Sequence, residues 1–131
     1  MKAQEQYMQL QMLAQSIQQG QQQAQAIEAQ LQELKKAKKT IESIKKGQKV
    51  KFPISAGVYV EAIVEQDEEL LVNVGAGVAC KKPTKDSLEV IDKQLKELSD
   101  YQQKLIAKVQ DQAIKAQKLE KQIEEDLKKN V

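Results

Sequence analysis

Two long helical patterns of nearly equal length flank a short strand-like insert, and this layout constrains the fold more than any other feature. Residues 1–47 and 83–131 have helical periodicity, whereas residues 48–82 alternate with a period of two. Helices of equal length joined by one insert can fold back on each other throughout. At about 1.5 Å rise per residue, each would reach roughly 65–70 Å. We therefore expect a single, mostly α domain of the α+β class: an antiparallel coiled-coil hairpin with a small β head.

Apolar residues recur in each helical segment with the alternating three- and four-residue spacing of a coiled coil. In the first segment this seam contains Leu10, Leu13, Ile17, Gly20, Ala24, Ile27, Leu31, Leu34, Lys38 and Ile41. In the second it contains Leu88, Ile91, Leu95, Leu98, Gln102, Leu105, Val109, Gln112, Ala116, Leu119 and Ile123. Gly47 suits the left-handed residue that follows a helix, and Thr84 or Asp86 is the expected N-cap of the second segment.

Gly20 falls opposite Val109 and Gln112 when the hairpin is folded about its insert. A glycine within a helix costs about 1 kcal/mol relative to alanine, so we expect loose packing and bending or fraying in the outer half. The alternative is that this small residue lets the two helices approach closely. The sequence leaves both interpretations open.

The insert predicts four short strands in two hairpins. Alternating apolar residues mark the strands, and Ser55-Ala56-Gly57 and Gly75-Ala76-Gly77 supply turns with glycine where positive φ is expected. Four short strands are not stable alone, and their open edges would pair with other chains. We therefore expect heads of several subunits to join into a closed β assembly, built by Val50, Phe52, Ile54, Val58, Val60, Val72 and Val74.

The composition offers little for catalysis. The chain has no His, no Arg and one cysteine, Cys80, which we expect on a buried strand. Gly75-Ala76-Gly77 lacks the third glycine of a dinucleotide-binding turn, and no Gly-Lys-Ser/Thr enters a helix. A single thiol without histidine makes no metal site. We therefore expect a non-enzyme without cofactor or metal, in a reducing, cytoplasmic setting, with no membrane span.

Lysines are concentrated near the head. Between Lys35 and Lys51 there are eight lysines and one acid, Glu42, although the formal net charge of the chain is only +2. A solvated face and a docking patch for an acidic partner both fit this lysine cluster. Nucleic-acid binding is disfavoured, because arginine and stacking aromatic residues are scarce or missing.

The outer ends of the helices carry apolar residues that the pairing of two helices does not fully bury. Tyr7, Met8 and Met12 lie off the seam, and methionine recurs at binding sites that accept varied apolar surfaces. These residues either widen the coiled-coil core or form a binding surface. The candidate set is Tyr7, Met8, Leu10, Met12, Leu13, Ile17, Leu119, Ile123 and Leu127, with Val131 beyond them.

The insert resembles the alpha-class subunit of prefoldin, of the archaeal type. The similarity is carried by Phe52-Pro53-Ile54-Ser55-Ala56-Gly57-Val58-Tyr59-Val60 and by Val72-Asn73-Val74-Gly75-Ala76-Gly77-Val78-Ala79. The resemblance implies a hexamer of two alpha and four beta subunits, whose hairpins merge into a β-barrel platform. It also implies binding of unfolded polypeptides at the coiled-coil tips without ATP, and their transfer to a group II chaperonin.

Two hypotheses of different classes follow. The first is an ATP-independent holdase subunit that grips client proteins through the tip residues, with many weak contacts combining in avidity. The second is a structural coiled-coil scaffold whose heads polymerise into a filament without binding clients.

Overall fold

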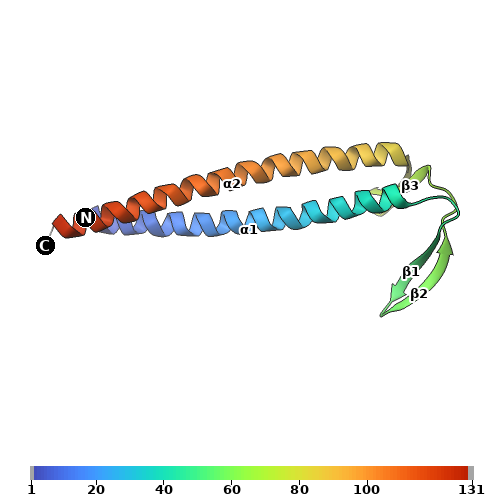
Figure 1. Cartoon of the computed structure of the whole chain (residues 1–131), viewed down its shortest axis with the longest axis horizontal. Helices are drawn as coiled ribbons and strands as arrows, with labels where there is room; N and C mark the ends of the chain where they lie inside the picture. The colour runs from blue at the N-terminus through green and yellow to red at the C-terminus, as the bar shows by residue number, and fades with distance from the viewer. Residues whose placement is uncertain (1, 130–131) are drawn as a thin grey trace. The chain divides into compact units, whose positions relative to one another are not determined.

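The protein consists of two long helices and four short strands. The computed structural model describes residues 2–129. Helix α1 spans Lys2–Ser43 and helix α2 spans Thr84–Lys129, with strands between them: β1 (Lys49–Ser55), β2 (Val58–Ile63), β3 (Glu69–Gly75) and β4 (Val78–Pro83). The predicted fold class, two long helices with two β-hairpins, is confirmed; Val131 lies outside the described residues. Figure 1 shows the order of these elements along the chain.

These elements form two compact units. The first contains residues up to Leu31 together with those from Glu97 onward, and the second contains Gln32–Lys96. The first unit is therefore made of helix alone, whereas the second contains the ends of α1 and α2 that flank the strands, and both hairpins.

Within the first unit, α1 and α2 pack along the predicted seam. The seam residues of this unit are all buried or half-buried, as are those of the second unit, and Ile27, Leu31 and Ile123 are the buried large apolar residues of the described chain. Polar pairs interrupt this seam. Gln112 donates from Nε2 to the Ser16 hydroxyl at 2.8 Å, and Gln102 Nε2 donates to the Ala24 carbonyl at 3.2 Å. Such pairs are satisfied only in one alignment, so they help to set the helix register.

Gly20 is a point of close approach between the two helices. A Cβ atom built on Gly20 would lie 2.5 Å from Val109 Cγ2, far inside normal contact. Gly20 is itself buried. The close-approach alternative is therefore confirmed at this position, and α1 runs through it without a break. The physical reason is that Val109 fills the space that a side chain at this position would occupy.

In the second unit, the helix ends differ in detail from the predicted ones. Helix α1 ends at Ser43 rather than at residue 47, although Gly47 does take the predicted left-handed conformation, with φ +84°. The predicted N-cap is wrong, because α2 begins at Thr84 itself. The Thr84 hydroxyl instead donates a hydrogen bond to the carbonyl oxygen of Asp67 at 2.7 Å. A tertiary contact has replaced the local cap.

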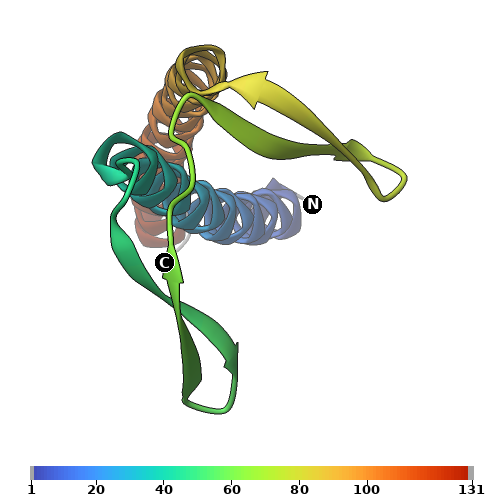
Figure 2. The ribbon, with the colours of Figure 1, turned by 90° about the vertical axis from the view of Figure 1, so that its right-hand side faces the viewer.

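The four strands form two separate antiparallel hairpins, β1–β2 and β3–β4. Figure 2 shows them extending from the helix ends in different directions. Each has a two-residue turn with positive φ at both positions: Ala56 (46°) and Gly57 (82°), then Ala76 (53°) and Gly77 (73°). This is the turn geometry that matches the twist of paired strands. The glycines were predicted, but the left-handed alanines were not.

Candidate functional site

The outer ends of α1 and α2 expose four large apolar side chains. Tyr7 and Leu127 are each 50% exposed, Met8 is 63% exposed and Met12 is 67% exposed. Met8 and Met12 lie one helical turn apart on α1 and share a face. We call these four residues the tip patch. They are the part of the predicted binding set that is free to contact another molecule without rearrangement of the helices.

The other five residues of that predicted set lie in the helix–helix seam. Ile123 is only 6% exposed, and four residues are half-buried: Leu10, Leu13, Ile17 and Leu119. Their apolar side chains stabilise the pairing of α1 with α2, since removing such surface from water is favourable. The structure thus brings the tip patch to the surface and places the rest beneath it. Binding by any of the nine residues stays a prediction.

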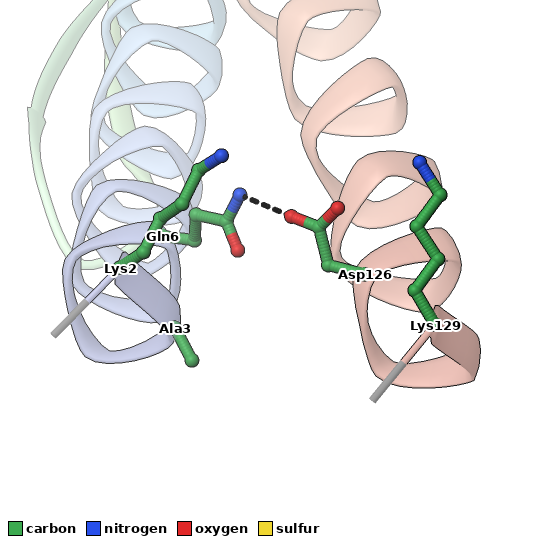
Figure 3. Close-up of a pocket in the computed structure, with 5 residues that line it drawn as sticks. All are labelled: Lys2, Ala3, Gln6, Asp126 and Lys129. Atoms are coloured by element: carbon green, nitrogen blue, oxygen red, sulfur yellow. Dashed lines mark hydrogen bonds between the residues drawn. The ribbon is translucent and has the colours of Figure 1, made fainter. Parts of the chain in front are cut away.

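A polar contact joins the helices at the same end. Gln6 is 8% exposed, and its Nε2 donates to Asp126 Oδ2 at 3.1 Å. Figure 3 shows the two side chains directed toward each other, with the Lys2 and Lys129 side chains beside them. Together with Ala3 these residues line a shallow cavity of about 240 Å³. Because a buried amide without a partner is costly, the pair favours one alignment of the helix ends.

The first hairpin exposes apolar side chains on both faces. Val50 pairs with Ala62 and Phe52 with Val60, so these four side chains share one face. Phe52 is 64% exposed on this face. On the other face Pro53 pairs with Tyr59, which is also exposed. A hairpin with so little cover cannot account for its own stability, and it requires a partner surface.

The second hairpin is partly covered by the helix ends. Leu70 and Val72 are half-buried, whereas Val74 and Leu71 are exposed. A groove of about 500 Å³ runs along β3 and is lined by both helices and the hairpin: Ile41, Leu70, Leu71, Val72, Asn73, Lys82, Ser87, Val90, Ile91 and Gln94. Of the seven predicted assembly residues, five are therefore exposed in the single chain (Phe52, Ile54, Val58, Val60 and Val74), and Val50 and Val72 are half-buried.

Sequence reasoning missed further exposed apolar residues in the hairpins: Tyr59, Ile63, Leu71 and Val78. The signal for the first two was present, because both alternate with the predicted inward residues of the second strand. Tyr59 and Ile63 lie on the face that also carries Lys49, Lys51 and Glu61, so this second face of the first hairpin is mixed in character, with apolar side chains that a partner surface could bury.

The linker between the hairpins holds the helix ends in place. The Lys46 N–H donates to Asp67 Oδ2 at 3.1 Å, while the Asp67 carbonyl accepts from the Thr84 hydroxyl. The Thr84 N–H donates to the Glu68 carbonyl at 2.8 Å. One short linker therefore contacts both the segment after α1 and the start of α2. These hydrogen bonds tie the segment between the hairpins to both helix ends.

Two side-chain groups near the hairpins need separate description, the Cys80 thiol and the Lys38 ammonium. Cys80 is exposed on β4, so the predicted burial of this thiol is wrong; in the single chain no second layer covers β4. In the lysine cluster, Lys38 Nζ lies 2.7 Å from Asp92 Oδ1. This hydrogen bond and the Asp92 charge raise the pKa of Lys38 above its ordinary value.

Within residues 2–129, no three His, Cys, Asp or Glu residues gather closely enough to hold a metal ion. Neither helix of this described range is long and apolar enough to cross a bilayer.

Two paired helices with two β-hairpins that expose apolar side chains define a class of coiled-coil subunits that form oligomers. The family model described as "Prefoldin subunit" matches residues 9–129. The chain therefore belongs to the prefoldin family.

Curated relatives named "Prefoldin subunit alpha" are similar to this chain over part of its length. The protein of Methanobrevibacter smithii is 33% identical over 58 residues, covering 44% of this chain and 40% of the relative. That of Nitrosopumilus maritimus is 34% identical over 61 residues, covering 47% and 42%. The matched segments thus span about two fifths of the relatives' length.

Among solved structures, the fold is similar to a chain of the filamentous PFD from Methanocaldococcus jannaschii. The TM-score is 0.71 at 19% sequence identity, and the match covers 85% of this chain and 94% of the other. This likeness supports the assignment of the fold.

Proposed function

We propose that this chain is an alpha-class prefoldin subunit that acts as an ATP-independent holdase. In this proposal, hairpins of several subunits merge into a β-barrel platform, and the tip patch contacts unfolded polypeptides. A group II chaperonin receives the client. The expected assembly is a cytoplasmic hexamer with two copies of this chain and four beta-class subunits.

The observation that carries the proposal is the exposure of apolar side chains at two places with different roles. The hairpins expose Phe52, Ile54 and Val60 around strands with open edges, which is the surface expected of a subunit contact. The tip patch exposes Tyr7, Met8 and Met12 on a helix, without a groove of fixed shape. Flexible thioethers suit clients of varied sequence. The relatives named as alpha subunits support the assignment to this class.

The test is suppression of client aggregation. A thermally unfolding enzyme is heated with the chain assembled with a beta-class partner, and light scattering is followed. We expect protection without ATP, and weaker protection when residues 1–17 are deleted. The control variant keeps residues 1–17 and carries Gln103→Ala at an exposed position away from the tips. Full aggregation in the presence of the assembled wild-type protein would reject the holdase proposal.

A second candidate is a filament-forming scaffold, which the similarity of the fold to a chain of filamentous PFD favours. In this case the hairpins of identical chains polymerise and the tips bind no client. Electron microscopy of the chain alone separates the two, since a scaffold forms filaments and gives no protection in the scattering assay.

A further inference from the structure

The outer half of α1 has a second regular stripe on the side opposite the seam. Its residues follow one another in steps of four and three. Each lies two places before a position of the seam, if the seam is extended back to Gln6, and two residues correspond to about 200° around a helix. Every one of them is exposed. We call these residues the glutamine stripe: Gln4, Met8, Gln11, Gln15, Gln18, Gln22 and Gln25.

This side of the coiled coil carries no charge. From Gln6 to Ile27 the helix contains no charged side chain, although exposed helix surfaces usually carry many. The part of α2 in the same unit is different. It exposes Lys104, Lys108 and Asp111 among other charged residues. The two helices therefore present chemically different surfaces to solvent, one of neutral amides and one of mixed charges.

Neutral amides suit contact with another polypeptide of variable sequence. A glutamine side chain both donates and accepts hydrogen bonds, as the peptide groups of an unfolded chain do. Removing such a group from water costs much less than removing an ammonium or carboxylate group. Met8 belongs to both the stripe and the tip patch, so the two sets of residues meet at this position.

We propose that the glutamine stripe is a client-contact surface that takes uncharged segments of unfolded polypeptide. This inference rests on the proposed holdase function, and it assigns the client surface to α1 rather than to the charged side of α2. Each contact is weak, but a client that contacts several residues along the stripe at once is retained through their combined avidity. Because no charge takes part, binding of neutral segments is insensitive to ionic strength.

The test uses a variant with three substitutions that introduce charge into the stripe, and a matched control. The stripe variant carries Gln11→Lys, Gln15→Lys and Gln18→Lys. The control carries Gln103→Lys, Gln110→Lys and Gln117→Lys at exposed positions of α2. Lys and Gln have similar helix propensity, so both variants keep the helix, which circular dichroism verifies. A second stripe variant with Glu at the same three positions separates loss of neutrality from a specific effect of positive charge.

The probe is a fluorescent, unstructured peptide of Gln, Ser, Gly and Leu, bound to the chain assembled with its beta-class partner. We expect wild-type affinity to be equal at low and high salt. Both stripe variants should lose at least about fivefold in affinity, or about 1 kcal/mol. The α2 control should stay within about twofold of the wild type.

Three outcomes would overturn the inference. Equal losses in the stripe and α2 variants would show that the stripe has no special role. Salt-sensitive wild-type binding would show that charges make the contact. A change in assembled mass in the stripe variants alone would show that a second copy occupies the stripe. By contrast, a wild-type assembly that binds neither the peptide nor a denatured enzyme rejects the holdase function itself, so the two failures are distinguishable.

Discussion

Replacing Gly20 by Ala tests the close helix approach at the centre of the coiled coil. In an isolated helix this change would stabilise the chain by about 1 kcal/mol, because glycine is a poor helix former. In this structure the new methyl group would lie 2.5 Å from Val109 Cγ2. The helices must then separate or Val109 must change its rotamer, and such overpacking costs about 1–3 kcal/mol. We therefore expect Gly20→Ala to lower the free energy of unfolding by up to about 2 kcal/mol, which is the larger cost less the gain in helix propensity.

The companion substitution Val109→Ala isolates this contact. It removes the Cγ2 atom and leaves space that the methyl group introduced by Gly20→Ala can fill. In the Val109→Ala background, Gly20→Ala should therefore stabilise the chain by about its helix-propensity gain of 1 kcal/mol. The change of sign between the two backgrounds corresponds to a coupling free energy of about 1–3 kcal/mol, within the range for residues in contact.

The assay is urea unfolding followed by far-ultraviolet circular dichroism. All four members of the cycle are measured at one protein concentration, because association contributes to apparent stability. If Gly20→Ala stabilised the protein equally in both backgrounds, the close packing of Gly20 against Val109 would be refuted.

Other predictions concern the second unit. Asp67→Ala should lower the free energy of unfolding by about 1 kcal/mol, because it removes the acceptor of the Lys46 N–H, and hydrogen exchange at that amide should become faster. Glu65→Ala, at an exposed position of the same linker, should leave that exchange rate unaltered. Ala56→Asn should stabilise the first hairpin by about 0.5–1 kcal/mol, because Asn tolerates the left-handed conformation better; slower exchange in β2 is expected, and unchanged exchange would contradict it. The stabilising contribution of Lys38 is fully present below its unfolded-state pKa of 10.5 and is lost as pH rises through the higher folded pKa, so the stability difference from Lys38→Gln should be constant around neutral pH and shrink in alkaline solution. A difference that shrinks near neutral pH would contradict this assignment.

The helical part of the fold could be predicted from the sequence because its information is local and periodic. A seam such as Leu13, Ile17 and Gly20 follows from spacing alone, and the structure buries or half-buries these positions. The glycines of the turns were also accessible, since positive φ has a strong residue preference. The left-handed Ala56 was not, because tertiary pairing of the strands overrides its own preference.

Other features depended on contacts distant in sequence. The N-cap of α2 was mispredicted because the Thr84 hydroxyl contacts Asp67 in the linker. The predicted burial of Cys80 assumed a covered strand, whereas β4 has no second layer in the single chain. For the candidate site, periodicity separated Met8 and Met12 from the seam correctly. It did not separate the other five members of the set, which also lie on the seam: Leu10, Leu13, Ile17, Leu119 and Ile123.

The central claim is that the exposed apolar side chains of the hairpins are subunit contacts, and native mass spectrometry tests it most directly. The wild-type chain is compared with a Phe52→Asp, Val60→Asp variant, each alone and mixed with a beta-class partner; these two side chains face each other across the first hairpin. We predict an assembly containing several chains for the wild type, and its loss or marked weakening in the variant, with the helical content retained. A wild-type chain that stays a well-folded monomer at micromolar concentration in both conditions would contradict the account.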